Sequence, residues 1–457
     1  MKILLLIITL ITINLTNSST LWTKLIGTDK TEQGYSITTD SNNNVYLSFF
    51  TNGNFDGNLN VGGVNSFLNK FDATGNKIWT KLIATQYSNV TSVTADSNNN
   101  IYVVGITSAP SLDGNTNAGG QCDSFVFKFD SLGNKLWTRM IGTNGTDLAV
   151  STTTDSNNNV YVVGGTNGNL DGNTNNGGEG DAFFVKFDSS GNKLWTKLVG
   201  SISGEMPYSV TTDLNKNVYI TGVTDGNLDG YKNAGEYDVF VTKLDSLGNR
   251  IWTKLLGSNR TDVSNSVTTD SNNNIYVTGW TNGELDGNKN DGGNSDIYLT
   301  KFDSSGTKLW TKQYGTSKNE EGASVRTDSN NNVYVAGWSE GNLDGNTNLG
   351  RWDAFLSKFD SLGNRNWTKL IGTNSTDEAS VVVKDTNDYI LVAGTTKGDL
   401  DGNKNSGFAH IFVTKMDKNC IPYTKDNVTN CLSGSMSCHN IPLWLLILYL
   451  LLIIKNN

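Results

Sequence analysis

A tryptophan-containing phrase recurs along the chain at an almost constant interval. The triplet Trp-Thr-Lys, or once Trp-Thr-Arg, begins at Trp22, Trp79, Trp137, Trp195, Trp252, Trp310 and Trp367. Successive copies lie 57 or 58 residues apart. A period of this length is typical of propellers, solenoids and repeat arrays, and it restricts the fold more strongly than any local propensity.

The third unit, residues 149–200, illustrates the secondary structure that each unit predicts. Its four strand candidates are 150–155, 160–166, 182–188 and 194–199, and each is rich in β-branched and aromatic residues. Asn-rich and Gly-containing turns separate the first pair and the last pair, which predicts two tight antiparallel hairpins. One such unit cannot bury both faces of its sheet, whereas units packed around a ring can.

The two ends of the repeat region are complementary. A lone fourth strand, residues 20–27, precedes the first complete unit, and a third strand at 410–417 has no fourth strand after it. We therefore expect an all-β fold, a seven-bladed β-propeller of four-stranded antiparallel blades. The N-terminal strand would complete blade seven and close the ring, leaving no open sheet edge between the ends. The repeated tryptophan is then expected to pack between blades.

The phrases "DSNNNVYVVGGT" and "DAFFVKFDSSGNKLWTKLVG" resemble the SBBP β-propeller repeat family. The resemblance covers residues 20–417 and recurs seven times. It implies the propeller architecture and a secreted or surface location, because the family occurs mostly in such proteins. It implies no particular activity, since the family has no general catalytic assignment.

The charge of the chain restricts its partners. The formal net charge is −9 and the pI is near 4.9, without a basic arm or patch. Such a chain is repelled by nucleic acid and by anionic lipid, so neither is expected as a partner. We expect a monomeric propeller that meets the membrane only through its C-terminal segment.

Residues 1–19 have the pattern of a signal peptide. Lys2 supplies the positive start, residues 3–13 the apolar segment, and Asn17 to Ser19 a small polar exit. Export to an oxidising compartment is therefore expected.

The C-terminal end has two parts. Residues 418–440 are a polar linker with Cys420, Cys431 and Cys438, in which one disulfide of undetermined pairing is expected. Residues 441–457 carry a hydrophobic anchor or anchor signal, whose apolar run is short for a membrane span but suits a lipid-anchor signal. The sequence thus predicts an extracellular protein attached to the cell surface by a C-terminal lipid anchor or membrane segment.

The long loop between the second and third strands carries a candidate calcium site. Six units read Asp-Gly-Asn-x-Asn, and oxygen side chains at alternate positions suit a hard cation. The candidate ligands are Asp56, Asp113, Asn115, Asn117, Asp171, Asn173, Asn175, Asp286, Asn288, Asn290, Asp344, Asn346, Asn348, Asp401, Asn403 and Asn405. The aspartates that open the third strand would add a carboxylate, with Ser66 and His410 at that place in units one and seven. The alternative is that Asx turns and glycines merely shape the loop.

Residues that differ between units are better indicators of a specific ligand than those that all units share. Trp280 and Trp338 follow the glycine of the second strand in units five and six, where other units have smaller or different side chains. Arg351 and Trp352 add a cation and an aromatic ring nearby. These four residues are the candidate ligand-binding residues of one asymmetric pocket on the loop face. The alternative is that the two tryptophans pack between blades.

The sequence contains little that points to catalysis. Its two histidines, His410 and His439, lie in unlike places, and the nucleophile elbow, phosphate loop and metal-protease motifs are missing. We therefore expect a non-catalytic binding or adhesion scaffold that holds an extracellular protein or glycan through its loop face. The alternatives are a calcium-assisted carbohydrate-binding protein and, less favoured, a glycoside hydrolase.

Overall fold

The computed structural model describes residues 20–60, 63–85 and 87–417. The predicted signal segment 1–19, the cysteine-containing linker 418–440 and the apolar segment 441–457 lie outside these residues, so the expectations about them stay predictions. Within the described ranges, no helix combines the length and apolar character that a membrane crossing requires.

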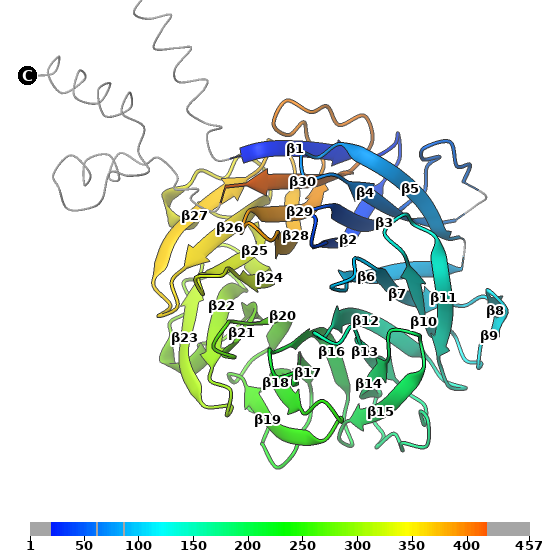
Figure 1. The fold of residues 1–457 in the computed structure, drawn as a ribbon. Coiled ribbons are helices and arrows are strands. Elements are labelled where there is room, and N and C mark those ends of the chain that lie inside the picture. The colour runs from blue at the N-terminus through cyan, green and yellow to red at the C-terminus, as the bar shows by residue number, and fades with distance from the viewer. Residues whose placement is uncertain (1–19, 61–62, 86, 418–457) are drawn as a thin grey trace, which may run out of the picture.

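Seven four-stranded antiparallel sheets form a ring, so the predicted all-β, seven-bladed propeller is confirmed (Figure 1). From the inner to the outer strand, blade one is β2 (Glu32–Thr39), β3 (Val45–Thr51), β4 (Asn65–Phe71) and β5 (Lys77–Ala84); blade two is β6 (Ser88–Ala95), β7 (Ile101–Thr107), β10 (Asp123–Phe129) and β11 (Lys135–Ile141); blade three is β12 (Asp147–Thr154), β13 (Val160–Thr166), β14 (Asp181–Phe187) and β15 (Lys193–Val199). Blade four is β16 (Glu205–Thr212), β17 (Val218–Thr224), β18 (Asp238–Leu244) and β19 (Arg250–Leu256); blade five is β20 (Asp262–Thr269), β21 (Ile275–Thr281), β22 (Asp296–Phe302) and β23 (Lys308–Tyr314); blade six is β24 (Glu320–Thr327), β25 (Val333–Ser339), β26 (Asp353–Phe359) and β27 (Arg365–Ile371).

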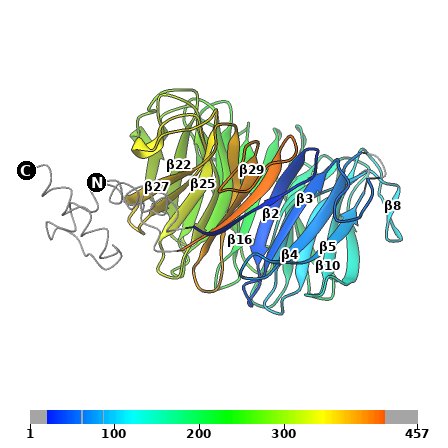
Figure 2. The same cartoon turned by 90° about the horizontal axis from the view of Figure 1, so that it is seen from above.

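The seventh blade joins the two ends of the described chain. Its inner strands are β28 (Asp377–Lys384), β29 (Ile390–Thr396) and β30 (His410–Met416), and its outer strand is β1 (Thr20–Ile26). β1 pairs antiparallel with β30, with Lys24 opposite Val413, and the two strands lie side by side in Figure 1. Seen edge-on in Figure 2, the seven blades make a disc.

Small elements occupy some of the long loops. The strands β8 (Ser111–Leu112) and β9 (Asn115–Thr116) form a short hairpin at the outer edge of blade two (Figure 1). Single 3₁₀ turns, η1 (Leu285–Gly287) and η2 (Leu343–Gly345), stand at the matching place in blades five and six.

The strand boundaries follow the side-chain pattern except where a bulge interrupts it. In blade three the second strand covers the predicted residues 160–166 and is almost wholly buried. The first strand begins at Asp147, three residues before the predicted start. Its register shifts between Ala149 and Ser151, so one residue is left unpaired and the alternation of side chains is broken there. The sequence pattern therefore indicates only the part of the strand after the bulge.

The recurring tryptophan packs between blades, as predicted. Trp137 of blade two contacts a core that combines Tyr102 of its own blade with Phe187 of blade three. Its Nε1 donates to the Ser189 carbonyl, 3.3 Å away in the next blade. The Lys128 ammonium donates to the same carbonyl at 2.7 Å and lies over the Tyr102 ring. Each blade thus meets the next through an apolar core closed at one end by polar contacts.

The structure corrects one assignment in the first unit. The residue that opens the third strand of blade one is Asn65, which lies opposite Thr51 just as Asp123 lies opposite Thr107 in blade two. Ser66, which is predicted at this place from the sequence, is the next residue along and lies opposite Phe50. The error arose because the first unit differs from the others in residue type at this position.

Candidate functional site

The Asp-Gly-Asn-x-Asn loop folds back along the outer strand of its own blade. In blade three Asp171 has a left-handed backbone, with φ of 51°, and starts a tight turn with Gly172. Asp171 Oδ2 accepts hydrogen bonds from Thr196 Oγ1 and Lys193 Nζ, each at 2.5 Å. Asn173 Nδ2 donates to the Leu170 carbonyl at 3.0 Å and to the Thr196 carbonyl at 3.3 Å. The loop therefore covers part of the exposed edge of β15, which is the edge strand of the sheet.

The predicted calcium ligands make equivalent contacts in the other blades. Ion pairs join Asp56 to Lys77, Asp113 to Lys135, Asp286 to Lys308 and Asp344 to Arg365, and Thr23 of β1 donates to Asp401. Amide groups of Asn115, Asn288, Asn346 and Asn403 donate to backbone carbonyls of their own loops, and those of Asn117, Asn175, Asn348 and Asn405 donate to the carbonyl that ends the second strand. Asn290 accepts from the Gly292 amide.

These contacts bear on the electrostatics of the loops. Although burial acts to raise it, the pKa of Asp171 is lowered by the hydrogen bonds from Lys193 and Thr196. Among the described residues, His, Cys, Asp and Glu side chains form no cluster of three or more that could hold a metal ion. Calcium binding by the loops stays a prediction.

A second set of carboxyl groups lies between the blades. The first residue of the third strand in one blade faces the first residue of the first strand in the next. At five interfaces both are acids: Asp123 with Asp147, Asp181 with Glu205, Asp238 with Asp262, Asp296 with Glu320 and Asp353 with Asp377. All ten side chains are buried. We call them the interblade acid pairs.

Each aspartate in these pairs has one oxygen bound and one without a partner. Asp147 Oδ2 accepts from the Thr143 amide and hydroxyl at 2.7 and 2.9 Å, and Asp123 Oδ2 accepts from the Ala118 amide. The Oδ1 atoms of both residues are buried without a hydrogen-bond partner in the described structure, as are those of the six other aspartates. Gly142 allows this packing, because a Cβ there would lie 2.2 Å from the Asp123 carboxyl carbon.

Burial raises the pKa of several of these acids, and a nearby like charge adds to the effect in some of them. Burial is the main cause for Asp123, and the nearby Asp147 adds to it, so that the Asp123 pKa is raised to about 6. The pKa of Asp296 is also raised to about 6, mainly by burial and further by Asp291 and Glu320. A pair of this kind suits a shared proton or a bound cation, either of which would offset the repulsion.

The two remaining interfaces replace the acid pair by residues that do not repel each other. Between blades one and two, the residues at the equivalent positions are Asn65 and Ser88. Between blades seven and one, His410 Nε2 lies 4.0 Å from Glu32 Oε2. Where the third-strand position of the pair lacks an aspartate, the pair as a whole no longer consists of two acids. The two positions are therefore best understood as one interacting pair.

Three of the four predicted ligand-binding residues come together on blade six. The rings of Trp338 and Trp352 are stacked with centroids 4.8 Å apart and planes 25° apart. Trp352 Nε1 donates to Glu340 Oε1 at 2.7 Å, and the exposed Arg351 guanidinium lies 5.0 Å from the Trp352 ring centre. Trp338, Trp352 and Arg351 will be called the blade-six stack. Trp280 lies one blade away between Val263 and Ile297, and among the described residues no ring contact links it to the stack.

Acidic residues that the sequence analysis did not single out adjoin the stack. Glu321 lies directly opposite Trp338 on the neighbouring strand. Burial, with the nearby Glu378 of blade seven, raises the pKa of Glu321 to about 7. Comparing the second residue of the first strand between units would have found both, since that position holds Leu148, Met206 and Val263 in blades three to five.

Comparisons with known proteins agree with the repeat architecture. A family model described as "SBBP: Beta-propeller repeat" matches residues 78–110, 194–229, 251–286 and 309–344. The chain is 24% identical over 503 residues to an uncharacterized WD repeat-containing protein, L264, of Acanthamoeba polyphaga mimivirus, a match that covers 83% of this chain and 36% of that protein. It is 27% identical over 213 residues to the regulatory protein FlaEY of Caulobacter vibrioides, covering 42% of this chain and 22% of that protein.

Similar solved structures include the Neurospora crassa Pan2 WD40 domain and the polysaccharide lyase Uly1. Their TM-scores are 0.47 and 0.49, at 12% and 11% sequence identity, and the matches cover 86% of this chain and 91% of each of those chains. The curated relatives are much longer than this chain, which spans about a third or less of each. The four segments that match the SBBP β-propeller repeat all lie within the seven-bladed ring, so the repeat match and the observed fold agree.

Proposed function

We propose that the protein is a non-catalytic binding scaffold that holds an extracellular protein or glycan at the blade-six stack. The observation that supports this is a stacked pair of tryptophan rings beside an exposed arginine, and among the described residues it is the one ring contact that joins two tryptophans. Stacked rings offer a rigid apolar platform at little cost in conformational entropy. Tryptophan and arginine are also the residue types on which binding energy most often concentrates.

The neighbouring acids give this platform a polar edge. Glu340 orients the Trp352 indole by accepting from its Nε1, and Glu321 lies opposite Trp338 on the neighbouring strand, so an acidic residue adjoins each ring. A fixed ring beside carboxylates suits the apolar face and hydroxyl groups of a sugar, and it also suits a peptide with a basic residue. Export and attachment at the cell surface complete the proposal, and they rest on the residues at the two ends of the chain.

The direct test compares binding by the wild-type protein and by Trp352→Ala. Binding is measured on a glycan array and by cross-linked capture from extracellular material. Removing a central tryptophan typically costs 2 kcal/mol or more, about a 30-fold loss of affinity, with little change in melting temperature because the ring is half-buried. Arg351→Ala is the second variant, since its side chain is exposed.

The matched control is Tyr87→Ala, which removes an aromatic ring that is 61% exposed on another part of the ring. Equal losses in Tyr87→Ala and Trp352→Ala would contradict a specific site. Binding that is unchanged in both Trp352→Ala and Arg351→Ala would also reject the blade-six stack. Release of reducing sugar from a bound glycan would reject a non-catalytic role in favour of a hydrolase.

A calcium-assisted carbohydrate-binding protein is the second candidate. The unpartnered buried oxygens of the interblade acid pairs favour it, because two carboxylates with free oxygens attract a hard cation. A bound ion raises the melting temperature by mass action. We expect the melting temperature in millimolar calcium to exceed that in chelator by several degrees. Equal melting temperatures in calcium and in chelator would contradict calcium binding both at the acid pairs and at the Asp-Gly loops.

A further inference from the structure

The channel at the centre of the ring has a wall of hydroxyl groups with two cationic residues on one side. Its volume is about 440 Å³, and the first strands of all seven blades line it. Serines and threonines contribute most of the lining. Arg326 of blade six and Lys384 of blade seven are the only cationic side chains among the lining residues that the structure describes.

Two adjacent levels of this wall differ in how their hydroxyl groups are used. At the level nearer the hairpin turns, threonines donate to the inner strand of the preceding blade, as Thr212 does to the Thr154 carbonyl at 3.0 Å and Thr269 to the Thr212 carbonyl at 3.0 Å. Thr39, Thr154 and Thr327 do the same. These hydroxyls hold neighbouring inner strands together.

At the next level of the described channel wall, the threonine hydroxyls form no hydrogen bonds with the protein. Its residues are Thr38, Thr94, Thr153, Thr211, Thr268, Arg326 and Val383, one from each blade at the same register position. Among the described residues, the five threonine hydroxyls of this level have no hydrogen-bond partner in the protein, whereas every threonine of the level below has one.

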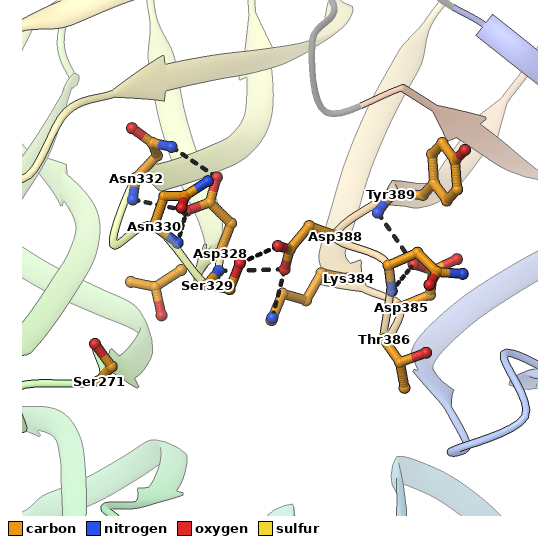
Figure 3. Close-up of polar contacts among 12 residues, drawn as sticks. Ser271, Asp328, Ser329, Asn330, Asn332, Lys384, Asp385, Thr386, Asp388 and Tyr389 are labelled. Carbon is orange, nitrogen blue, oxygen red and sulfur yellow. Dashed lines mark hydrogen bonds and ion pairs between the residues drawn. The ribbon is translucent and has the colours of Figure 1, made fainter.

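Arg326 is the exception in a level otherwise made of threonine and valine. Among the described residues, no carboxylate lies within ion-pair distance of Arg326 and no group forms a hydrogen bond with it. The carboxylates on the nearby turns already have partners, as Figure 3 shows for blades six and seven: Asp328 binds Asn332, and Asp388 binds Ser329 and Lys384. Burial lowers the pKa of Arg326, and no neighbouring charge compensates.

An unpaired guanidinium facing a polar channel is costly unless an anion meets it. Guanidinium groups bind planar and tetrahedral oxyanions through paired N–H donors, and hydroxyls complete the shell. We infer that the channel binds a small oxyanion, such as phosphate or sulfate, between Arg326 and the hydroxyl of Thr268 on the adjacent blade. Lys384 is neutralised by its ion pair with Asp388, which leaves Arg326 as the cationic lining residue without a carboxylate partner among the described residues, in a protein whose net charge is −9.

The test follows the melting temperature of the full protein in phosphate and in sulfate against chloride at equal ionic strength. Wild type should melt about 2 °C or more higher in either oxyanion. Arg326→Thr installs the residue that five other blades carry at this level, so it should fold. It should lose the oxyanion effect and melt at least as high as wild type in chloride, because it removes an unpaired charge that is half-buried in the channel wall. Thr268→Val should weaken the effect without abolishing it.

Lys289→Thr is the control, because it makes the same change of charge at an exposed loop residue. It should keep the full oxyanion effect. A sulfated oligosaccharide distinguishes a free oxyanion from a sulfate group carried by a glycan. If wild type binds the oligosaccharide more tightly than free sulfate, and this binding requires Arg326, the natural ligand is a sulfated glycan. The inference fails if wild type shows no oxyanion effect, if Arg326→Thr keeps it, or if Arg326→Thr melts well below wild type in chloride.

Discussion

At the scale of the residue, the interblade acid pairs make the stability of the protein depend on pH in an unusual direction. Asp123 and Asp296 have a pKa raised to about 6 in the folded protein. In the unfolded chain an aspartate titrates near 3.9. Each therefore binds a proton more tightly when folded, and its contribution to stability is fully present below about pH 4 and is lost as pH rises through about 6. Turn residues such as Asp72, with a pKa lowered to about 2, act oppositely and only at lower pH.

We therefore expect the free energy of unfolding to fall as pH rises from 4.5 to 7.5. One unit of pKa shift corresponds to about 1.4 kcal/mol, so the fall is measurable by denaturant unfolding at each pH. The double variant Asp123→Asn with Asp296→Asn should show a smaller fall, because asparagine does not titrate and blade one already carries Asn65 at this place. Asp29→Asn, at an exposed position, should keep the wild-type slope. Equal slopes in wild type and the double variant would show that these carboxyls are ionised in the folded protein throughout.

At the scale of the element, the repeat pattern predicts the strands and hairpins of each blade. It does not predict the contacts that a long loop makes with the outer strand of its own sheet. The strands and hairpins of each blade follow from local alternation and turn residues, so they were readable in one unit. The clamp of Asp171 to Lys193 and Thr196 joins a loop to the outer strand of its sheet, and no local pattern indicates that approach. For the same reason the oxygen-rich loop was interpreted as a cation site, although its side chains also bind protein groups.

The candidate site was predictable only in part for a related reason. Trp338, Trp352 and Arg351 were found because they break the repeat pattern, and the structure brings these three together. Trp280 breaks the pattern in the same way but lies apart from the stack, because neighbouring blades diverge outward from the channel. Glu321 and Arg326 are exceptions too, on the innermost strand. The surroundings of Glu321 and Arg326 include residues of other blades, and the sequence of a single unit does not show which residues these are.

At the scale of the whole molecule, the ring depends on one pairing between residues far apart in the chain. β1 lies against β30, and Thr23 Oγ1 is 3.1 Å from Thr414 Oγ1 across that pair. In blade three the matching pair is Val185 with Thr196, which lie close in sequence. Closing the ring therefore carries a loop-closure cost that pairing within a blade does not, and the cost rises with the logarithm of the loop length.

A disulfide at each place would measure this difference. Thr23→Cys with Thr414→Cys closes a loop of nearly the whole ring, and Val185→Cys with Thr196→Cys closes a single hairpin. By the chain-entropy relation the first cross-link should stabilise by roughly 6 kcal/mol and the second by roughly 3 kcal/mol. Each pair of substitutions removes one strand-four threonine that donates to an Asp-Gly loop, but the second also removes Val185 from an apolar core. Each stabilisation is therefore taken between the oxidised and reduced forms of the same variant. The free energy of unfolding of each variant is measured by denaturant with and without reductant. The same difference measured for wild type is subtracted, which gives the stabilisation by each cross-link. Equal stabilisation would mean that β1 and β30 stay together in the unfolded ensemble, and no stabilisation by the first cross-link would mean that the ring opens at this seam before the blades unfold.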